Sequence, residues 1–314
     1  MPSRCVVDGR SESFVNDAGY TPVVEYRSLS PHPDLFSTVE CVWFARGPAI
    51  PRRMERILPD GCVELIVHLG EPFRRRLDAC FELQPSAFVV GPFTSALLVA
   101  PPETVATMGV RLRPGWAGAV LGAPASALTD SVARFEEIWG RAGSLFDEEL
   151  RGKSTDQERA GLALHFLRRR LSGRHRGEDS IVTTAVRSML SRHERLRVTS
   201  LARALGISRR QLERRFVAAV GLPPRSFARL ARFQRALHLR ARGQAAGWAD
   251  LAQAAGYADQ AHFIREFRAF AGTTPEAYAR EERDLAGQFV TGERLDDFFG
   301  AGDAFVQSPA PAGR

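Results

Sequence analysis

Two stretches of the chain, residues 198–216 and 248–267, repeat one arrangement of apolar and polar positions. In each stretch a short helical pattern leads to a glycine, Gly206 or Gly256, and a second helical pattern follows. A glycine at that point allows the positive φ of a tight turn without the strain that a Cβ would add. The pattern therefore predicts two copies of a unit made of a helix, a turn and a second helix.

The second helix of each unit is predicted to have an apolar stripe and a polar face. Its N-cap is Ser208 in the first unit and Asp259 in the second. The stripes consist of Leu212, Phe216, Phe263, Phe267 and Phe270, and the opposite faces carry Arg209, Arg210, Glu213, Arg214 and Val217, then Gln260, Ala261, His262, Ile264, Arg265 and Arg268. Arg, Gln and His at the start of a helix can reach base edges in a DNA major groove. One such helix is usually a solvated face, but two in tandem favour DNA binding.

A single helix over residues 225–242 is predicted to join the two units, since Phe227, Leu230, Phe233 and Leu237 form one stripe. At 1.5 Å per residue it spans roughly 27 Å. One turn of DNA is about 34 Å long. The two second helices are therefore predicted to enter successive major grooves.

These residues, in this order, resemble the DNA-binding domain of the AraC/XylS family of bacterial transcription regulators. The resemblance covers residues 180 to about 281 and includes the closing stretch 267–278 with its Gly, Pro and Tyr. It implies a sequence-specific regulator that binds double-stranded DNA and contacts RNA polymerase.

The resemblance also implies which residues contact bases. They are Arg209, Arg210, Glu213 and Arg214 in the first unit and Gln260, Ala261, His262, Ile264 and Arg265 in the second. Ala261 and Ile264 are apolar where many members of the family have polar groups. The second helix is therefore expected to read fewer bases, through thymine methyl groups or not at all at these positions.

Before residue 114 the apolar runs are short and are separated by turn residues, as is typical of strands. The runs are 23–26, 39–44, 63–69, 87–90, 96–99 and 107–112, and the later helical segments are 116–121, 124–128, 132–139, 144–150 and 157–171. The predicted fold class is α+β. An antiparallel β-rich, small barrel-like domain with trailing helices precedes an all-α domain with two helix-turn-helix units and a linker helix.

The predicted domain organisation follows these changes of pattern. It comprises a flexible arm at 1–19, a sensor or dimerisation domain at 20–171 (β-rich to about 113 and helical over 114–171), a linker at 172–179, the DNA-binding domain at 180–283 and a tail at 284–314. The tail holds several aromatic residues, so part of it is expected to dock on one of the domains.

The strand at 62–69 has a face that can bind a ligand. With a period of two, Cys62, Glu64, Ile66 and His68 share one side, and Val63, Leu65, Val67 and Leu69 share the other. Cys62, Glu64 and His68 are the candidate effector-binding residues, at a pocket or a soft-metal site. The alternative is a solvated outer face with one hydrogen-bonded histidine. The paired histidines of the usual cupin metal motif are absent, so neither a metal nor a cofactor is predicted.

The N-terminal half resembles, more loosely, the β-rich sensor modules attached to AraC-type domains. The residues that carry this resemblance to one subgroup lie in four stretches: 57–68, 90–92, 109–115 and 121–125. It implies a regulatory domain that binds an unknown small-molecule effector or forms a homodimer, without naming the effector.

Charge is concentrated in the predicted DNA-binding domain. Residues 180–283 hold 19 Arg and no Lys against 8 Asp and Glu, whereas the 314-residue chain has a net charge of +7. The remainder of the chain is therefore acidic, and the surface that attracts phosphate belongs to the helical domain. Four spread cysteines without a CxxC pair favour reduced thiols. No apolar run is long enough for a membrane span or a signal peptide, which predicts a cytoplasmic protein with no membrane partner.

Enzyme motifs are missing from the sequence. There is no G-x-S-x-G, P-loop, H-E-x-x-H or G-x-G-x-x-G pattern, and Asp60, Glu64 and Glu103 are scattered carboxylates with nothing to pair them as acid and base. No enzymatic activity is predicted. Three functions remain open: an effector-controlled regulator, a constitutive dimeric DNA-binding protein, and a cupin-like enzyme fused to a DNA-binding domain.

Overall fold

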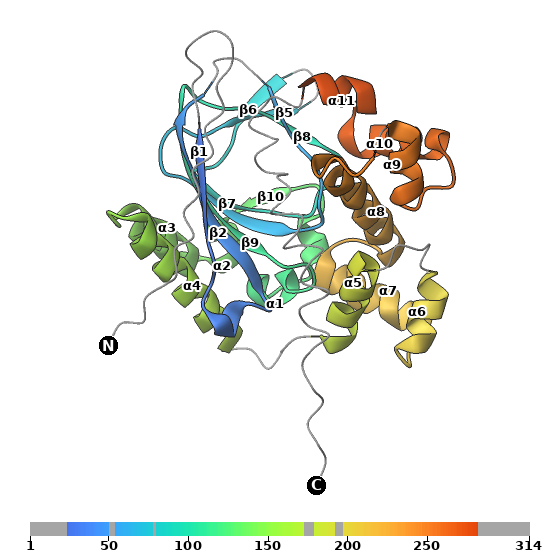
Figure 1. Ribbon diagram of the computed structural model, residues 1–314. Coiled ribbons are helices and arrows are strands. Elements are labelled where there is room, and N and C mark those ends of the chain that lie inside the picture. Colours follow the sequence, from blue (N-terminus) through green and yellow to red (C-terminus); the bar gives the residue numbers. More distant parts are fainter. Residues whose placement is uncertain are drawn as a thin grey trace.

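The computed structural model describes residues 24–49, 54–77, 80–172, 179–191, 197–245 and 247–281. A β-rich part, up to residue 172, lies against a helical part that begins at residue 179 (Figure 1). The predicted arm, the predicted tail and most of the predicted linker lie outside the described residues. Within the described ranges, no helix is long and apolar enough to cross a membrane.

The β-rich part consists of two antiparallel sheets. The larger sheet has the order β1-β2-β9-β4-β7-β10, with β1 Glu25–Leu29, β2 Val39–Pro48, β4 Val63–His68, β7 Ala87–Val90, β9 Thr104–Leu112 and β10 Val132–Arg134. The smaller sheet has the order β3-β8-β5-β6, with β3 Glu55–Ile57, β5 Arg74–Leu77, β6 Cys80–Leu83 and β8 Leu97–Ala100. The predicted antiparallel, β-rich fold is confirmed.

The larger sheet separates an apolar core from the smaller sheet. Val63, Leu65 and Val67 of β4 are buried in that core, where the following helices pack. These helices are α1 Ala117–Leu121, the short 3-10 helix η2 Ala125–Leu128, α2 Phe135–Trp139, α3 Arg141–Arg151 and α4 Asp156–Ser172, and a further 3-10 helix, η1, covers Pro33–Leu35. The predicted helix at 132–139 is partly wrong. Its first three residues form β10, because they pair with β7 at the edge of the sheet.

The helical part contains the two predicted helix-turn-helix units. Its helices are α5 Ser180–Ser191, α6 Val198–Ala204, α7 Arg209–Val220, α8 Pro224–Ala241, α9 Trp248–Ala254, α10 Gln260–Ala271 and α11 Pro275–Glu281. Gly206 and Gly256 have φ of 69° and 82°, which confirms why glycine occupies both turns. The predicted linker helix is α8.

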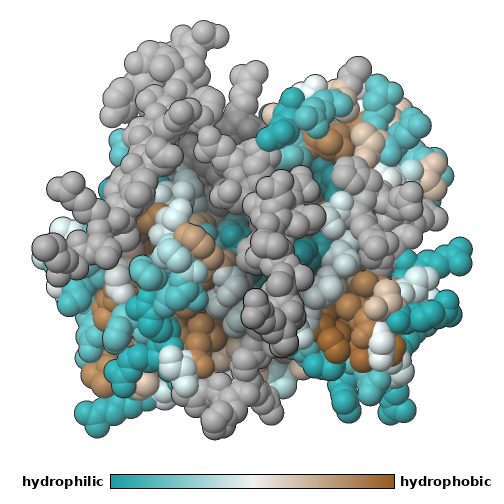
Figure 2. Space-filling model, turned by 60° about the horizontal axis from the view of Figure 1, so that its bottom comes forward, coloured by the Kyte–Doolittle hydropathy of each residue, from teal (hydrophilic) through white to brown (hydrophobic). Residues whose placement is uncertain are grey.

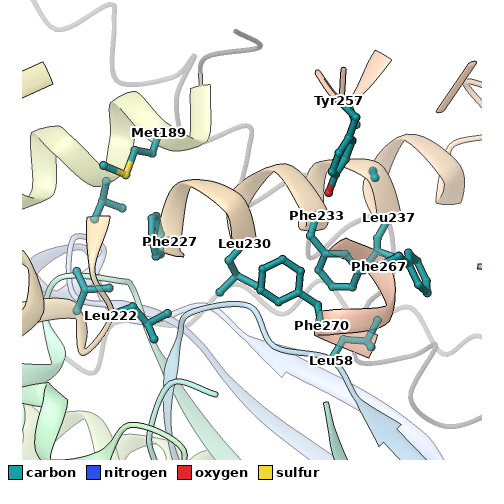
Figure 3. Close-up of a cluster of buried hydrophobic side chains, with 14 of the residues drawn as sticks. Leu58, Met189, Leu222, Phe227, Leu230, Phe233, Leu237, Tyr257, Phe267 and Phe270 are labelled. Atoms are coloured by element: carbon teal, nitrogen blue, oxygen red, sulfur yellow. The ribbon is translucent and has the colours of Figure 1, made fainter. Parts of the chain in front are cut away.

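The apolar stripes of α7, α8 and α10 meet in a single core. Leu58, from the β-rich part, belongs to this core, and Figure 3 shows it beside Phe270 of α10, below α8. Burial of such side chains is the main favourable term in packing. The β-rich part therefore supplies apolar contact to the helical core.

Candidate functional site

The first predicted base-reading face lies at the start of α7. Ser208 Oγ accepts the Gln211 backbone N–H at 3.2 Å, and the Gln211 side chain accepts the Ser208 N–H at 3.0 Å. This capping box fixes the start of the helix. Arg209, Arg210 and Arg214 are exposed on it. Figure 2 shows hydrophilic side chains projecting along the right-hand edge, the side on which the helical part lies in Figure 1.

Glu213 is the one acidic residue assigned to this face. Arg209 Nε donates to Glu213 Oε1 at 2.8 Å, with both side chains largely exposed. An exposed pair of this kind contributes little to stability. It can therefore open at small cost, and both groups can then turn to other partners.

The second predicted face lies at the start of α10. Asp259 Oδ1 accepts the His262 backbone N–H at 2.7 Å, which confirms the predicted N-cap. Gln260, Ala261 and Arg265 are exposed. Ile264 is half-buried and packs against the core.

His262 faces the protein more than solvent. Its ring lies edge-on to Tyr257 with centroids 5.3 Å apart, and its Nε2 lies 3.5 Å from Glu266 Oε1. Glu266 is itself buried and pairs with Arg229 of α8 at 2.6 Å. These contacts tie α10 to the linker helix. Among the residues assigned to α10, the exposed ones are Gln260, Ala261 and Arg265.

A cavity of about 160 Å³ lies between the two sheets of the β-rich part. Cys62, Glu64, Ile66 and His68 line it, all from one face of the strand that contains β4. The predicted alternation of that strand is therefore seen. The alternative of a solvated outer face is wrong, because Cys62 and His68 are buried at 5% and 2% exposure.

Two of the candidate effector residues are held in uncharged forms. Burial lowers the pKa of His68 to about 4, and burial raises the pKa of the Cys62 thiol well above its ordinary value. His68 Nε2 lies 3.1 Å from Gln84 Oε1, and its Nδ1 lies 3.0 Å from Thr107 Oγ1. A neutral ring carries one N–H, so Nε2–H donates to Gln84 and Nδ1 accepts from the Thr107 hydroxyl.

Glu64 belongs to a cluster around Arg111, a lining residue on β9. Arg111 Nη1 donates to Glu64 Oε1 and Nη2 to Asp60 Oδ2, both at 2.6 Å, and Nε lies 3.1 Å from Glu40 Oε1. Asp60 and Glu64 are scattered in the predicted pattern, and the fold brings both to one guanidinium. Arg111 was not among the predicted site residues. The period of two in strand 107–112 was the available signal, since it puts Arg111 on the same face as Thr107.

The loop at residues 58–61 connects the cavity to the linker helix. Gln234 of α8 lines the cavity, and its Nε2 donates to the Pro59 carbonyl at 2.5 Å. A Cβ on Gly61 would lie 2.8 Å from the Phe227 ring. Only glycine allows this approach, so the loop lies directly on α8.

The end of α10 is held by the smaller sheet. Arg56 Nη1, from β3, donates to the Ala271 carbonyl at 2.7 Å, and the Ala96 N–H, just before β8, donates to the Phe270 carbonyl at 2.7 Å. These carbonyls belong to the last turn of α10, where C=O groups have no N–H partner within the helix. The β-rich part supplies the hydrogen-bond donors.

The end of α7 is held at a separate place. Thr129 Oγ1 donates to the Gly221 carbonyl at 2.7 Å, and a Cβ on Gly221 would lie 2.6 Å from Pro92 Cγ. Helix α1 also packs here, since a Cβ on Gly118 would lie 2.9 Å from the Ala218 carbonyl oxygen. The β-rich part thus contacts α7, α8 and α10, while the starts of α7 and α10 stay exposed.

Comparison with protein families yields two matches. Residues 27–134 match a domain of unknown function, DUF6597, and residues 201–281 match a helix-turn-helix domain. The second match coincides with the span from α6 to α11. Residues 201–281 are an AraC-type helix-turn-helix domain. A domain of this type binds DNA and regulates transcription.

Several solved structures are similar to this chain. ToxT from Vibrio cholerae O395 is 12% identical with a TM-score of 0.42, and the match covers 75% of this chain and 96% of that chain. ToxT from Vibrio cholerae strain SCE256, described as bound to an unsaturated fatty acid, is 10% identical with a TM-score of 0.38, covering 84% and 96%. The AraC-like transcriptional activator CuxR is 14% identical with a TM-score of 0.27, covering 68% and 81%. Among curated proteins, none matches this chain.

Proposed function

We propose that this chain is a sequence-specific transcription regulator whose helices α7 and α10 read two successive segments of the major groove. The observation that carries this proposal is the pair of capped helix starts, at Ser208 and Asp259, with exposed polar side chains behind each cap. Helix starts of this kind present side chains to base edges and backbone N–H groups to phosphates.

The length of α8 supports the spacing of the two segments. It has 18 residues, which correspond to about 27 Å of helix. Contacts at both of its ends hold the units, since Phe227 packs on Phe216 of α7 and Arg240 lies over the Trp248 ring of α9. Two units held at opposite ends of a helix of this length suit sites about one DNA turn apart.

The β-rich part is proposed to bind a small-molecule effector in the cavity. The walls of the cavity include Ile57 of β3, Pro59, Leu97 of β8 and Gln234 of α8. The same segments hold α8 and the end of α10. A ligand that binds one arrangement of these walls better than another shifts the equilibrium between arrangements of the helix-turn-helix units.

Selection of binding sites from a random duplex pool tests the reading by two helices. The purified chain is expected to enrich a site with two specified segments about one turn apart. Arg210→Ala should relax the preference in one segment, and Arg265→Ala should relax the preference in the other. Enrichment of a single segment, or a change at the same base pairs in both variants, would contradict the proposal.

A cavity-filling variant separates an effector-controlled regulator from a constitutive DNA-binding protein. Val99 is buried and lines the cavity, so Val99→Phe should occupy the ligand's space. The Val99→Phe variant is expected to bind the selected site as the original chain does. A reporter gene controlled by that site should no longer respond to growth conditions. A reporter response equal to that of the original chain would favour the constitutive alternative. Turnover of a bound ligand would favour a fused enzyme.

We also propose that the chain forms a homodimer, and the exposed edge strand β6 supports this. Phe81 and Leu83 lie on it with 52% and 58% exposure, at the end of the smaller sheet. Exposed apolar side chains on an unpaired edge are typical of sites where strands associate. Sedimentation should give a dimer for the original chain and a monomer for Phe81→Ser with Leu83→Ser. RNA polymerase contact stays a prediction of the resemblance alone.

A further inference from the structure

The charge of the cavity wall is unbalanced. Asp60 and Glu64 line the cavity beside Arg111, and Glu40, which does not line it, is the third carboxylate around the single guanidinium. The side chains of Arg111 and Glu40 are 9% and 3% exposed, so water screens their charges poorly. Burial alone would lower the pKa of Arg111, but the surrounding carboxylates outweigh it, Asp60 first, and raise that pKa above its ordinary value. The cluster therefore contains a permanent cation and carries excess negative charge.

The charge of Arg111 is already offset by carboxylates. Each of its three guanidinium nitrogens lies within 3.1 Å of a carboxylate oxygen. Among the described residues that line the cavity it is the only arginine, and there is no lysine among them. His68 is neutral near pH 7, so it adds no positive charge. The neighbouring Arg151, which does not line the cavity, is bonded to the carbonyls of His68 and Ser86.

The rest of the lining is apolar and aromatic. The rings of Trp43, Phe73 and Phe88 contribute to it. The ring of Phe93 also lines the cavity and already has the Arg75 guanidinium over its face, 5.2 Å from the centroid. The face of an aromatic ring is electron-rich and attracts cations, most strongly in the case of Trp. Aromatic faces and excess carboxylates therefore both favour a cationic ligand.

The volume of the cavity limits the size of that ligand. A cavity of about 150 Å³ is large enough for benzene, and this cavity has about 160 Å³. A ligand of one ring, or of similar branched apolar bulk, with a short chain is therefore the right size.

We propose that the cavity binds a small organic cation, a protonated amine on an apolar or aromatic body, with its charge against Glu64 and Asp60 and its body among the rings. This assignment rests on the proposed effector role of the cavity and names the chemical class of the effector. An acid of the same size would bring a further negative charge beside three carboxylates that share one guanidinium.

Three probes with one skeleton test the assignment: 2-phenylethylamine, 2-phenylethanol and phenylacetate, each added to the full chain in thermal unfolding and in calorimetric titration. Because a ligand that binds only the folded state stabilises it, the amine should raise Tm with increasing concentration. Phenylacetate should leave Tm unchanged, and the alcohol should bind at least tenfold more weakly than the amine.

Glu64→Gln is the informative variant, because Arg111 keeps Asp60 and Glu40 as partners while one negative charge is lost. It should weaken amine binding at least tenfold, and Glu82→Gln, on exposed β6, should not. The probe comparison needs no variant, so a failure of Glu64→Gln to fold does not prevent the test.

Binding of the alcohol or the acid as tight as that of the amine overturns the cation assignment and leaves the cavity as an effector site. Binding of none of the three, or amine binding unchanged by Glu64→Gln, overturns it too. The proposed DNA reading fails separately, in the site selection without any probe, if two segments are not enriched.

Discussion

Arg111 and His68 lie on one cavity wall and respond to burial in opposite ways. Arg111 keeps its charge because three carboxylates surround it, whereas His68 has neutral partners and loses its charge. A buried ionisable group stays charged only where a partner offsets the cost of removing it from water. The polarity of the cavity is therefore set by which residues have charged neighbours.

His68 should make the fold sensitive to acid. An unfolded histidine takes up a proton near pH 6.5, whereas folded His68 does so near pH 4. Between these values the unfolded chain binds more protons, so stability falls as pH falls, by up to about 3 kcal/mol. His68→Gln should flatten that part of the curve in urea unfolding from pH 7 to 4. The control is His165→Gln, at an exposed position on α4. An unchanged slope in His68→Gln would refute the assignment.

Arg214 is the residue on α7 where specificity can be tested. Arg214→Ala should cost about 1 to 3 kcal/mol on the selected site and relax the preference at one position. Arg203, exposed on α6, provides the comparison. Its loss should weaken all sequences alike, with a salt slope about one unit smaller if it contacts phosphate. Equal losses for Arg214→Ala on selected and random DNA, in titrations at several salt concentrations, would show that Arg214 reads no base.

At the scale of elements, the ends of α7 are held by different means. Its start has a capping box within the helix, whereas its end relies on Thr129 and Pro92 of the β-rich part. The end of α10 relies in the same way on Arg56 and Ala96. Helices α7 and α10 are therefore anchored at the ends away from their exposed starts.

A pair of glycine variants measures this anchoring. Gly206 and Gly221 both have positive φ, of 69° and 88°. A Cβ on Gly206 meets nothing within 4 Å, so Gly206→Ala should cost only the backbone strain, about 1 to 2 kcal/mol. Gly221→Ala adds a clash with Pro92 and should cost clearly more. Hydrogen exchange should then rise at the end of α7 and in η2. Equal costs in urea unfolding, with no local change in exchange, would contradict the anchoring.

The sequence predicted elements with strong periodicity and missed those without it. The alternation in β4 and the stripes of α7, α8 and α10 correctly identified buried faces, because one face of each element packs on a core. Strands β5 and β6 escaped prediction because their residues are half-buried or exposed and show no apolar alternation. The three residues of β10 were predicted to be helical, because three residues are too few to show the period of two of a strand. Only their pairing with β7 makes them a strand.

At the scale of the whole molecule, the contacts between the two parts could not be predicted from local pattern. Leu58, Gln234 and Arg56 each contact a partner more than 100 residues away in the chain. All four stretches that carry the N-terminal resemblance contain residues next to the helical part: 57–68, 90–92, 109–115 and 121–125. No local pattern identifies these residues, because they pack against helices that lie far along the chain.

The sequence also predicted one face of the cavity, but it did not predict the balance of charges there. Cys62, Glu64 and His68 came from alternation in one strand, whereas Arg111 and Gln234 come from other elements. Only the fold reveals that Glu64 shares its cation with two further carboxylates. The chemical class of the ligand is therefore a property of the assembled molecule.

We propose that one chain reads DNA through two helices, α7 and α10. The experiment that tests this is a footprint of the full chain across the DNA upstream of its own gene, with random DNA as competitor. We expect protection of two adjacent major-groove segments about one helical turn apart for each protomer, with one segment lost in Arg210→Ala and the other in Arg265→Ala. A single protected segment, or protection that both variants weaken evenly along its length, would contradict the account.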